Sequence, residues 1–293
     1  MNASERAAAA KPAAVSGRLG VLVAAALFST GGAVIKAVHL SGWQVACLRS
    51  GIAALVLLVL IPESRKALSR RALAVGAVHA VTLILFVQAN KHTTAASATF
   101  LQSTAPLYVL VLSPWLLRER AKRSDLVLMA AMAAGLALFF VGLDTASATA
   151  PDPLAGNLMA AAAGFSWALT VMGLRWLGRS GGGSAAGAAV LGNGAAFAVC
   201  LPLALPLAGA TPADWAGVAF LGVVQVGLAY VFLTRAMARV AAFEASLLLL
   251  LEPVLNPVWA WLAHGERPGA WSLAGGALIL GATAGKTWLD SRR

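Results

Sequence analysis

The sequence repeats itself at an offset of 147 residues. Pro106 falls on Pro253 at this offset, and the pair Glu119-Arg120 falls on the pair Glu266-Arg267. Each copy contains an apolar run with an internal proline, a charged turn and a second run rich in Gly and Ala. Weak internal symmetry of this kind is typical of membrane transporter folds. The sequence therefore predicts a chain made of two related halves.

The composition indicates that both halves lie in a lipid bilayer. Hydrophobic residues make up 60% of the 293 residues, charged residues make up 11%, and the mean hydropathy is +0.81. Soluble domains have roughly 45–50% apolar and about 25% charged residues. Because a helix needs about 20 apolar residues to cross the hydrocarbon, the chain is predicted to be an all-α integral membrane protein with ten transmembrane helices. The predicted spans are residues 19–38, 42–61, 72–90, 94–117, 124–143, 154–176, 184–208, 213–237, 241–263 and 269–288.

Five spans per half have a topological consequence. An odd number of spans makes the second half enter the membrane from the opposite side, so the two five-helix repeats are inverted relative to each other. We predict a mobile cytoplasmic tail over residues 1–18, a first repeat over 19–150 and a second over 151–290.

The basic residues predict the orientation. Eighteen of the 22 Lys and Arg residues fall on one side of the predicted spans, Lys36, Lys91 and Arg267 fall on the other, and Arg49 lies within a span. Cytoplasmic loops carry the excess of Lys and Arg, so both termini are predicted to be cytoplasmic, in a bacterial-type inner membrane. The net charge of +11 is spread over these short loops and does not indicate a nucleic-acid partner.

Several chemistries find no support in the sequence. There is no Walker-type phosphate loop and no His-Glu-x-x-His, and the four histidines are scattered. We therefore expect no cofactor, no metal site and no catalytic residues, and we expect transport to run on a gradient rather than on ATP. An intramembrane enzyme would need an acid, base or nucleophile cluster on facing helices, which cannot be assembled here.

Paired motifs resemble those of a known family. They are Ser103-Thr-Ala-Pro-Leu-Tyr, Leu116-Leu-Arg-Glu-Arg, Leu251-Glu-Pro-Val-Leu-Asn-Pro, His264-Gly-Glu-Arg and Cys47-Leu-Arg-Ser-Gly. They resemble the hallmarks of EamA-type proteins of the drug/metabolite transporter superfamily, from about residue 19 onward, and overall look closest to the YddG-like aromatic amino-acid exporters. The resemblance implies an inner-membrane protein of ten helices in two inverted halves that exports small metabolites such as amino acids.

The paired prolines suggest where a pathway lies. Proline in mid-helix lacks an N–H group, so Pro106 is predicted to free the carbonyl of Gln102, and Pro253 that of Leu249. Freed carbonyls at mid-membrane depth need protein or a wet cavity, which favours a pathway between the fourth and ninth spans. Local 3₁₀ adjustment is the alternative.

Polar residues at helical spacing outline one central cavity. A zwitterionic substrate needs acceptors for its ammonium group, donors for its carboxylate and apolar walls. The candidate substrate-binding residues are Ser29, His79, Thr82, Phe86, Thr99, Gln102, Ser103, Trp167, Gln225, Tyr230, Ser246, Glu252 and Asn256. Phe100 and Phe165 are further candidate walls. The candidate hinges are Gly31, Gly32, Pro106, Gly164, Gly222 and Pro253.

Four side chains on or near the predicted cavity each allow two interpretations. His79 either contacts substrate or forms structural hydrogen bonds, and Glu252 is either a coupling carboxylate or a cap on broken backbone. Lys36 either snorkels to the outer interface or contacts substrate. Arg49 is predicted to bond one helix to another, and Trp167 is either a cavity wall or packing.

The prediction for function is a secondary transporter that exports small metabolites, most simply aromatic or hydrophobic amino acids, by alternating access. Gly281 and Gly285 are predicted to pack on Ala130 and Gly135 of the fifth span, which favours a monomer. Alternatives are a drug, nucleotide-linked or lipid-linked metabolite transporter, an intramembrane lipid-modifying enzyme, and a channel or structural protein. The sequence leaves the coupling ion open.

Overall fold

The computed structural model describes residues 17–66, 69–116, 123–180, 184–237, 240 and 248–291. Regular structure in these ranges is helical, apart from one isolated bridge between Ser147 and Ala150. In chain order there are a helix over 17–29, α2 (Gly31–Ala37), α3 (Gly42–Leu60), the 3₁₀ turn η1 (Pro62–Lys66), α4 (Arg70–His92), α5 (Ala95–Gln102), α6 (Ala105–Leu116), α7 (Arg123–Val141), α8 (Pro153–Ser180), α9 (Ala185–Ala204), α10 (Pro212–Phe220), the π-helix η2 (Leu221–Leu228), α11 (Ala229–Met237), α13 (Leu251–His264) and α14 (Ala270–Ser291).

These helices match the ten predicted spans in order. Seven described segments are long and apolar enough to cross a bilayer, and shorter apolar helices lie over Asp125–Val141 and Ala270–Gly285. The ninth span is represented by α13, because most of its predicted first turns fall outside the described residues. The predicted fold class, an all-α membrane protein of ten helices in two inverted repeats, is confirmed.

Local side-chain chemistry explains where several helices begin. Ser41 and Gln44 form a capping box at the start of α3. Thr94, Ser184 and Thr211 each accept a hydrogen bond from a backbone amide in the first turn of α5, α9 and α10. Each such cap contributes about 1 kcal/mol. The caps fix the chain's entry into the membrane close to the predicted boundaries.

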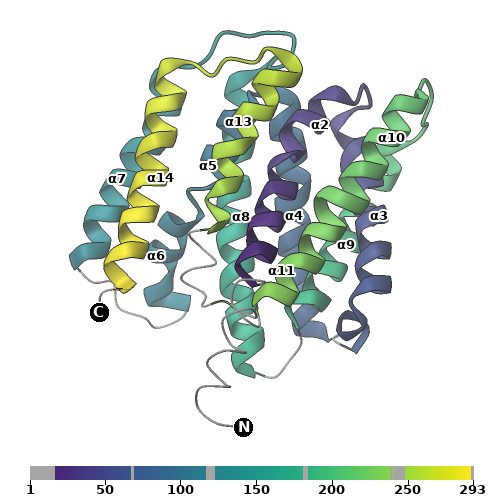
Figure 1. Cartoon of the computed structure of the whole chain (residues 1–293), viewed down its shortest axis with the longest axis horizontal. Helices are drawn as coiled ribbons and strands as arrows, with labels where there is room; N and C mark the ends of the chain where they lie inside the picture. The colour runs from purple at the N-terminus through teal and green to yellow at the C-terminus, as the bar shows by residue number, and fades with distance from the viewer. Residues whose placement is uncertain are drawn as a thin grey trace.

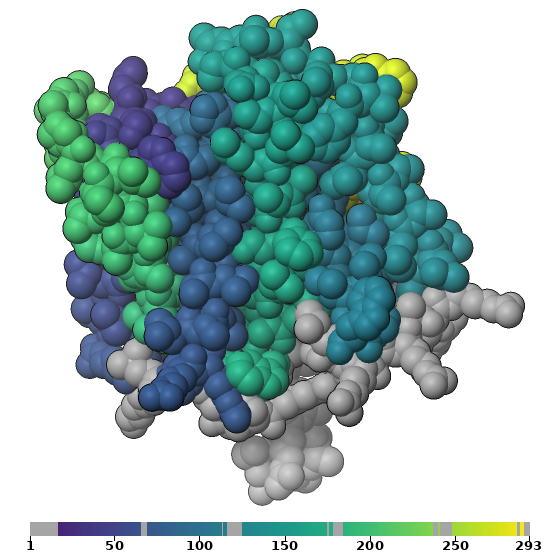
Figure 2. All heavy atoms as spheres, turned by 180° about the vertical axis from the view of Figure 1, so that it is seen from behind, coloured from purple at the N-terminus to yellow at the C-terminus, as the bar shows by residue number. Residues whose placement is uncertain are grey.

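The helices form one bundle with two apolar packing groups. Figure 1 shows α3, α4 and α9 toward one side and α7 with α14 at the other. Viewed from behind, α4 and α8 run side by side across the middle (Figure 2), and they pack directly on each other. One buried cluster joins α2, α3, α4, α9 and η2, and a second joins α5, α7, α8 and α14.

Both proline motifs begin a helix instead of kinking one. The fourth span is broken at residues 103–104, and Pro106 is the second residue of α6. In the ninth span residue 250 is a turn, and Pro253 is the third residue of α13. Each proline thus lies beside a disruption within its span, and the bonds from the amides of Thr104 and Leu107 to carbonyls three residues earlier correspond to the local 3₁₀ alternative. The pathway between the two spans stays a prediction. The two breaks still correspond at the 147-residue offset, since 103 maps to 250.

The third and eighth spans differ in local geometry. α4 is a continuous α-helix, whereas the eighth span contains the eight-residue π-helix η2. Gly222 and Gly227 of η2 approach α3 so closely that a Cβ atom there would lie 2.5 Å from Ile52 and Val56 side chains. π segments are rare and frequent at functional sites.

The last span packs on the fifth, as predicted, but through different glycines. A Cβ atom at Gly135 of α7 would lie 2.8 Å from Ile279, and one at Gly275 of α14 would lie 2.7 Å from the Gly135 carbonyl. No atom of the described residues would lie within 4 Å of a Cβ at Gly281 or Gly285. The prediction that these two glycines form the contact was therefore wrong, because they face away from α7.

Candidate functional site

Four ring-bearing side chains meet near the middle of the bundle, one from each of four spans. The Tyr230 hydroxyl lies 3.5 Å from Nε2 of His79. The Trp167 ring lies 5.7 Å from the His79 ring, and Phe28 meets Tyr230 edge-on at 5.5 Å. His79 is nine residues into α4, about 13 Å deep at about 1.5 Å per residue. The structure thus brings three predicted site residues together and adds Phe28.

Arg49 of α3 lies beside these rings. It is the largest fully buried side chain of the described residues, and its guanidinium lies within electrostatic range of both Tyr230 and His79. We call Phe28, Arg49, His79, Trp167 and Tyr230 the central cluster. The residues come from both repeats.

Several buried polar atoms in and around the central cluster have no hydrogen-bond partner among the described residues. They include Nε of Arg49, Oγ of Ser50, Nδ1 of His79 and Oε1 of Gln225. An unsatisfied buried donor or acceptor costs about 1–3 kcal/mol. Such unsatisfied buried atoms are rare in native proteins, so each needs a physical explanation. A bound ligand or water would satisfy these atoms; other atoms without a partner, such as Oδ1 of Asn90 and Oε1 of Glu266, lie elsewhere in the bundle.

A polar contact between α4 and α8 forms one wall. The Thr82 hydroxyl donates to the Ser166 hydroxyl at 3.0 Å, and Ser166 donates to the Val78 carbonyl at 2.8 Å. Thr82 is a predicted site residue, and Ser166 was missed because a lone serine among alanines carries no distinctive pattern.

The first span meets the eighth span through small residues. A Cβ atom at Gly31 would lie 2.9 Å from Nε2 of Gln225, which donates to the Phe28 carbonyl at 3.2 Å. Ser29 accepts a hydrogen bond from the indole N–H of Trp259 at 2.9 Å. A side chain at position 31 would therefore displace the Gln225 amide.

The first span meets the fourth and ninth spans in the same way. The Asn256 amide donates to the Thr99 hydroxyl. A Cβ atom at Gly32 would lie 2.3 Å from Oδ1 of Asn256. Predicted residues Gly32, Thr99 and Asn256 are therefore in mutual contact, where α2, α5 and α13 cross.

Gly164 of α8 lies against the backbone at the break in the fourth span. A Cβ atom at Gly164 of α8 would lie 2.9 Å from the Leu101 carbonyl and 3.1 Å from the Gln102 carbonyl. Gln102 and Ser103 at this break are partly exposed, and the Ser103 hydroxyl donates to the Thr99 carbonyl at 2.8 Å. Close approach at Gly164 therefore packs α8 directly against the broken backbone.

The remaining predicted residues lie apart from these contacts. Phe86 is buried in the apolar cluster with Ile35 and Val45, and Phe100 packs on Phe139. The Phe165 ring meets Tyr108 edge-on at 5.5 Å. Glu252 is partly buried, within electrostatic range of Tyr230. Ser246 lies outside the described residues.

A second polar group lies at the loop end of the bundle. Nζ of Lys36 lies 3.2 Å from Oε1 of Glu266, with both side chains at most 3% exposed. Lys36 also donates to the carbonyls of Asn90, Thr93 and Thr149. Oε2 of Glu266 accepts from the amide of Ala95, the first residue of α5. We call Lys36, Asn90, Thr93, Thr149 and Glu266 the loop-end network.

The loop-end network corrects the prediction for Lys36. Snorkelling would leave its ammonium group in water, whereas this group is buried against four acceptors. Two come from the end of α4, one from the turn after residue 144 and one from the 265–269 loop. The predicted substrate contact is not supported either, because Glu266 and three carbonyls occupy the ammonium group. The sequence marked Glu266 as a repeat hallmark without indicating this partner.

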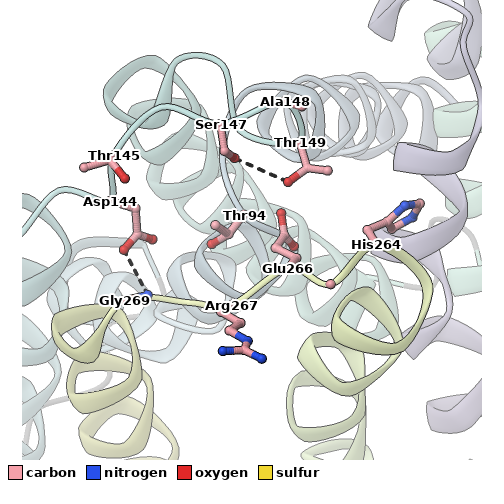
Figure 3. Close-up of a pocket in the computed structure, with 11 residues that line it drawn as sticks. Thr94, Asp144, Thr145, Ser147, Ala148, Thr149, His264, Glu266, Arg267 and Gly269 are labelled. Carbon is pink, nitrogen blue, oxygen red and sulfur yellow. Dashed lines mark hydrogen bonds between the residues drawn. The ribbon is translucent and has the colours of Figure 1, made fainter.

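Further bonds tie the loop end together. Thr93 donates to Oδ1 of Asn157 at 2.7 Å, and Asp144 accepts from Gly269 and Ser272. A pocket of about 390 Å³ lies here, between the turn that follows Asp144 and the 265–269 loop (Figure 3). In Figure 3 Glu266 points toward the Ser147–Thr149 turn. The pocket lies at the loop end, away from the central cluster.

The chemistry of the central cluster is that of recognition. Among the described residues no group of three or more His, Cys, Asp or Glu side chains could hold a metal ion. The site combines a buried cation, neutral donors and acceptors, and flat aromatic surfaces. Sites of this composition bind small molecules that carry both polar and apolar parts.

Comparison with known proteins agrees with this description. The sequence model of the EamA-like transporter family matches residues 15–141 and again residues 154–287. The two matches fall one in each half of the internal repeat.

Two curated relatives are similar over most of their length. The chain is 29% identical over 274 residues to the pseudopaline exporter CntI of Pseudomonas aeruginosa strain UCBPP-PA14, covering 90% of this chain and 93% of the relative. The CntI protein of strain PAO1 of the same species matches with the same identity and coverage. A solved crystal structure superposes with a TM-score of 0.63, covering 95% of this chain and 98% of that one at 23% identity, which shows the shared fold.

Proposed function

The chain belongs to the EamA-like transporter family, and from that premise we propose that it exports small metabolites that carry an amino-acid head group, by alternating access around the central cluster. The family and the exporter relatives indicate a multi-pass membrane transporter of a small molecule and not an enzyme. The amino-acid specificity, the direction and the mechanism are the proposal.

One observation carries the proposal. Among the described residues the buried Nε of Arg49 and Nδ1 of His79 have no hydrogen-bond partner, and the central cluster combines residues of both repeats. In transporters with inverted repeats the substrate site lies near the bilayer midplane at the repeat interface. The loop-end network closes the bundle above this site, on the side that the charge distribution predicts to be outer.

The side chains of the central cluster suit an amphoteric substrate. His79 and Tyr230 offer donors and acceptors, Arg49 is cationic, and Trp167 is a flat apolar wall. The acidic Glu252 lies near Tyr230. These features favour aromatic or hydrophobic amino acids, as in YddG-like exporters. Thr82, Gln102, Ser103, Thr99, Asn256, Gln225 and Ser29 are proposed to extend the cavity.

The rocking motion is proposed to use the close contacts of small residues. Gly31, Gly32 and Gly164 are the proposed hinges, together with the breaks before Pro106 and Pro253. A monomer with both termini in the cytoplasm fits the proposal. The charge distribution and the internal packing of α14 on α7 support these two points.

Pseudopaline is a second candidate substrate, because the CntI relatives are named for its export. Drugs, nucleotide-linked and lipid-linked molecules are further alternatives within the superfamily. A site that holds head-group charges at Arg49 and Glu252 favours a charged metabolite over an apolar drug.

Flux into proteoliposomes tests the proposal. Purified protein would be given radiolabelled phenylalanine, tyrosine, leucine, glutamate and lysine, and in parallel pseudopaline, with and without a pH gradient. Empty liposomes and protein carrying His79→Ala are the controls. We expect flux of the aromatic amino acids that His79→Ala reduces. No flux of any amino acid would overturn the amino-acid proposal, and flux of pseudopaline alone would favour the second candidate.

A further inference from the structure

Arg49 is a buried cation that has no acidic partner among the residues that the structure describes. Its residue is 2% exposed, and its Nε atom has no hydrogen-bond partner among the described residues. No described Asp or Glu lies within ion-pair distance of it. Removing a guanidinium from water is costly unless charges and hydrogen bonds replace the lost hydration. A fold that keeps such a residue at mid-membrane depth gains nothing from it in the ligand-free state.

A structural role would look different. Arg49 was expected to tie α3 to a neighbouring helix, which would place carbonyl or carboxylate oxygens against its donors. Lys36 shows what such a tie looks like in the same chain: a cation with equally low exposure bonds one carboxylate and three carbonyls. Arg49 has no comparable set among the described residues, so helix tying does not explain it.

The surroundings of Arg49 are arranged for a ligand. Among the described residues His79 Nδ1 and Ser50 Oγ are also buried and without hydrogen-bond partners, and Tyr230 lies near both Arg49 and Glu252. The backbone of η2 comes close at Gly222, where a Cβ would lie 3.0 Å from the Arg49 carbonyl. The site therefore contains a buried cation and an acidic side chain near one phenol ring.

We propose that Arg49 anchors a carboxylate group of the substrate. The planar guanidinium donates two parallel hydrogen bonds to a carboxylate, which supplies both the missing charge and the missing acceptors. The inference rests on the proposed function, because it places this group in the transport cavity. It deepens that function by defining the substrate class as carboxylic acids whose ammonium or other polar group points toward Glu252.

Matched acid and amide probes test this assignment in the purified full-length protein. Thermal unfolding would be followed against increasing 3-phenylpropanoate and its neutral counterpart 3-phenylpropanamide, and against L-phenylalanine and L-phenylalaninamide. We expect wild-type protein to bind each acid about tenfold or more tightly than the amide. Equal affinity for acid and amide, or no binding of any acid, would overturn the assignment.

Two variants of Arg49 test whether this residue causes the preference for acid over amide. Arg49→Gln should bind acid and amide equally, and Arg49→Lys should keep part of the preference because it keeps the charge but not the planar fork. Ligand-free Arg49→Gln should unfold at the same or a higher temperature than wild type, because no native pair is lost. A lower unfolding temperature with the acid preference intact would show a structural tie instead. Arg65→Gln is the matched control, because Arg65 is an exposed arginine in the 3₁₀ turn η1 that follows α3.

The proteoliposome assay separates the two proposals. Acid preference without amino-acid flux overturns amino-acid export and leaves the carboxylate anchor in place. Amino-acid flux that Arg49→Gln leaves unchanged overturns the anchor and leaves the exporter in place. Should Arg49→Gln fail to fold, two measurements still test the carboxylate anchor: the acid preference of Arg49→Lys and the comparison of acid and amide binding to wild-type protein.

Discussion

The loop-end network and the central cluster are both buried and polar, but their bonding differs. In the loop-end network Lys36 meets Glu266 and three carbonyls, and Glu266 also accepts from the Ala95 amide. In the central cluster Nε of Arg49 and Nδ1 of His79 have no partner among the described residues. Oε1 of Glu266 and Oδ1 of Asn90 also have no hydrogen-bond partner among the described residues, so the two regions differ in their charges. The buried cation of the loop-end network has a carboxylate beside it, whereas Arg49 has no described carboxylate within ion-pair distance.

The helix α5 connects the two regions. Its first amide is held by Glu266, and its last turn ends at the break against Gly164. Only eight residues separate these points. In the proposed cycle, opening the loop end breaks the Lys36–Glu266 pair, so α5 transmits the change to the break beside the cavity. Four substitutions, ordered by expected effect, test the contrast between the regions.

Lys36→Met should give the largest effect on stability. It leaves the Glu266 carboxylate buried without its cation, which costs about 3–5 kcal/mol for a buried pair. Thermal unfolding of the purified protein measures this. The double variant Lys36→Met/Glu266→Gln should recover much of the loss, since the unpaired charge is gone. A Lys36→Met protein as stable as wild type would contradict a stabilising network.

Gly164→Ala should disturb the link between the regions. Its new methyl group would lie 2.9 Å from the Leu101 carbonyl, so α5 or α8 must move, at a cost of about 1–3 kcal/mol. We expect transport rate to fall more than substrate affinity, measured as flux and as binding. Gly194→Ala in α9 is the control, because no described atom lies within 4 Å of a Cβ there. Equal behaviour of both variants would exclude a hinge at Gly164.

Tyr230→Phe should affect ligand binding and not the fold. The hydroxyl lies 3.5 Å from His79, too far for a strong hydrogen bond. Losing one polar contact to substrate costs about 1 kcal/mol, roughly a fivefold loss of affinity. Tyr108→Phe, which replaces the other tyrosine, is the control. A large drop in unfolding temperature for Tyr230→Phe would mean that the central cluster is structural.

Gly281→Leu should have the smallest effect on stability, so it serves as the reference for the other variants. The side chain would enter open space on α14 and change stability by less than about 0.5 kcal/mol. Gly135→Leu should destabilise the protein, because α14 occupies the space that its side chain would need. Loss of stability or a change of oligomeric state in Gly281→Leu would reveal a partner on this face and contradict the predicted monomer.

The sequence predicted the spans well because their ends are chemically local. Ser41, Ser69, Thr94 and Thr211 cap helices within a few residues of the predicted boundaries. It also placed His79, Trp167 and Tyr230 in one cavity, which the structure bears out as a spatial grouping. Their role in substrate binding stays a prediction.

The errors concern partners that lie far away in the chain. Lys36 was expected at the interface, but its anion is 230 residues later and its carbonyl acceptors come from the end of α4 and from the turn after residue 144. Gly281 and Gly285 fit a packing motif, but the rotation of α14 presents Gly275 to α7 instead. Helical spacing states which residues share a face and not which face meets a neighbour.

The sequence by itself determined a bilayer protein of ten helices in two inverted halves, because hydropathy, loop charge and an internal repeat are properties of the chain read in order. The tertiary structure decided which buried charges are satisfied. Lys36 and Arg49 are both basic residues near the end of or within an apolar span, and nothing in their neighbours in sequence distinguishes them. Only the packing of distant segments gives one cation an anion and leaves the other without one, since the cost of a buried charge depends on what surrounds it in space.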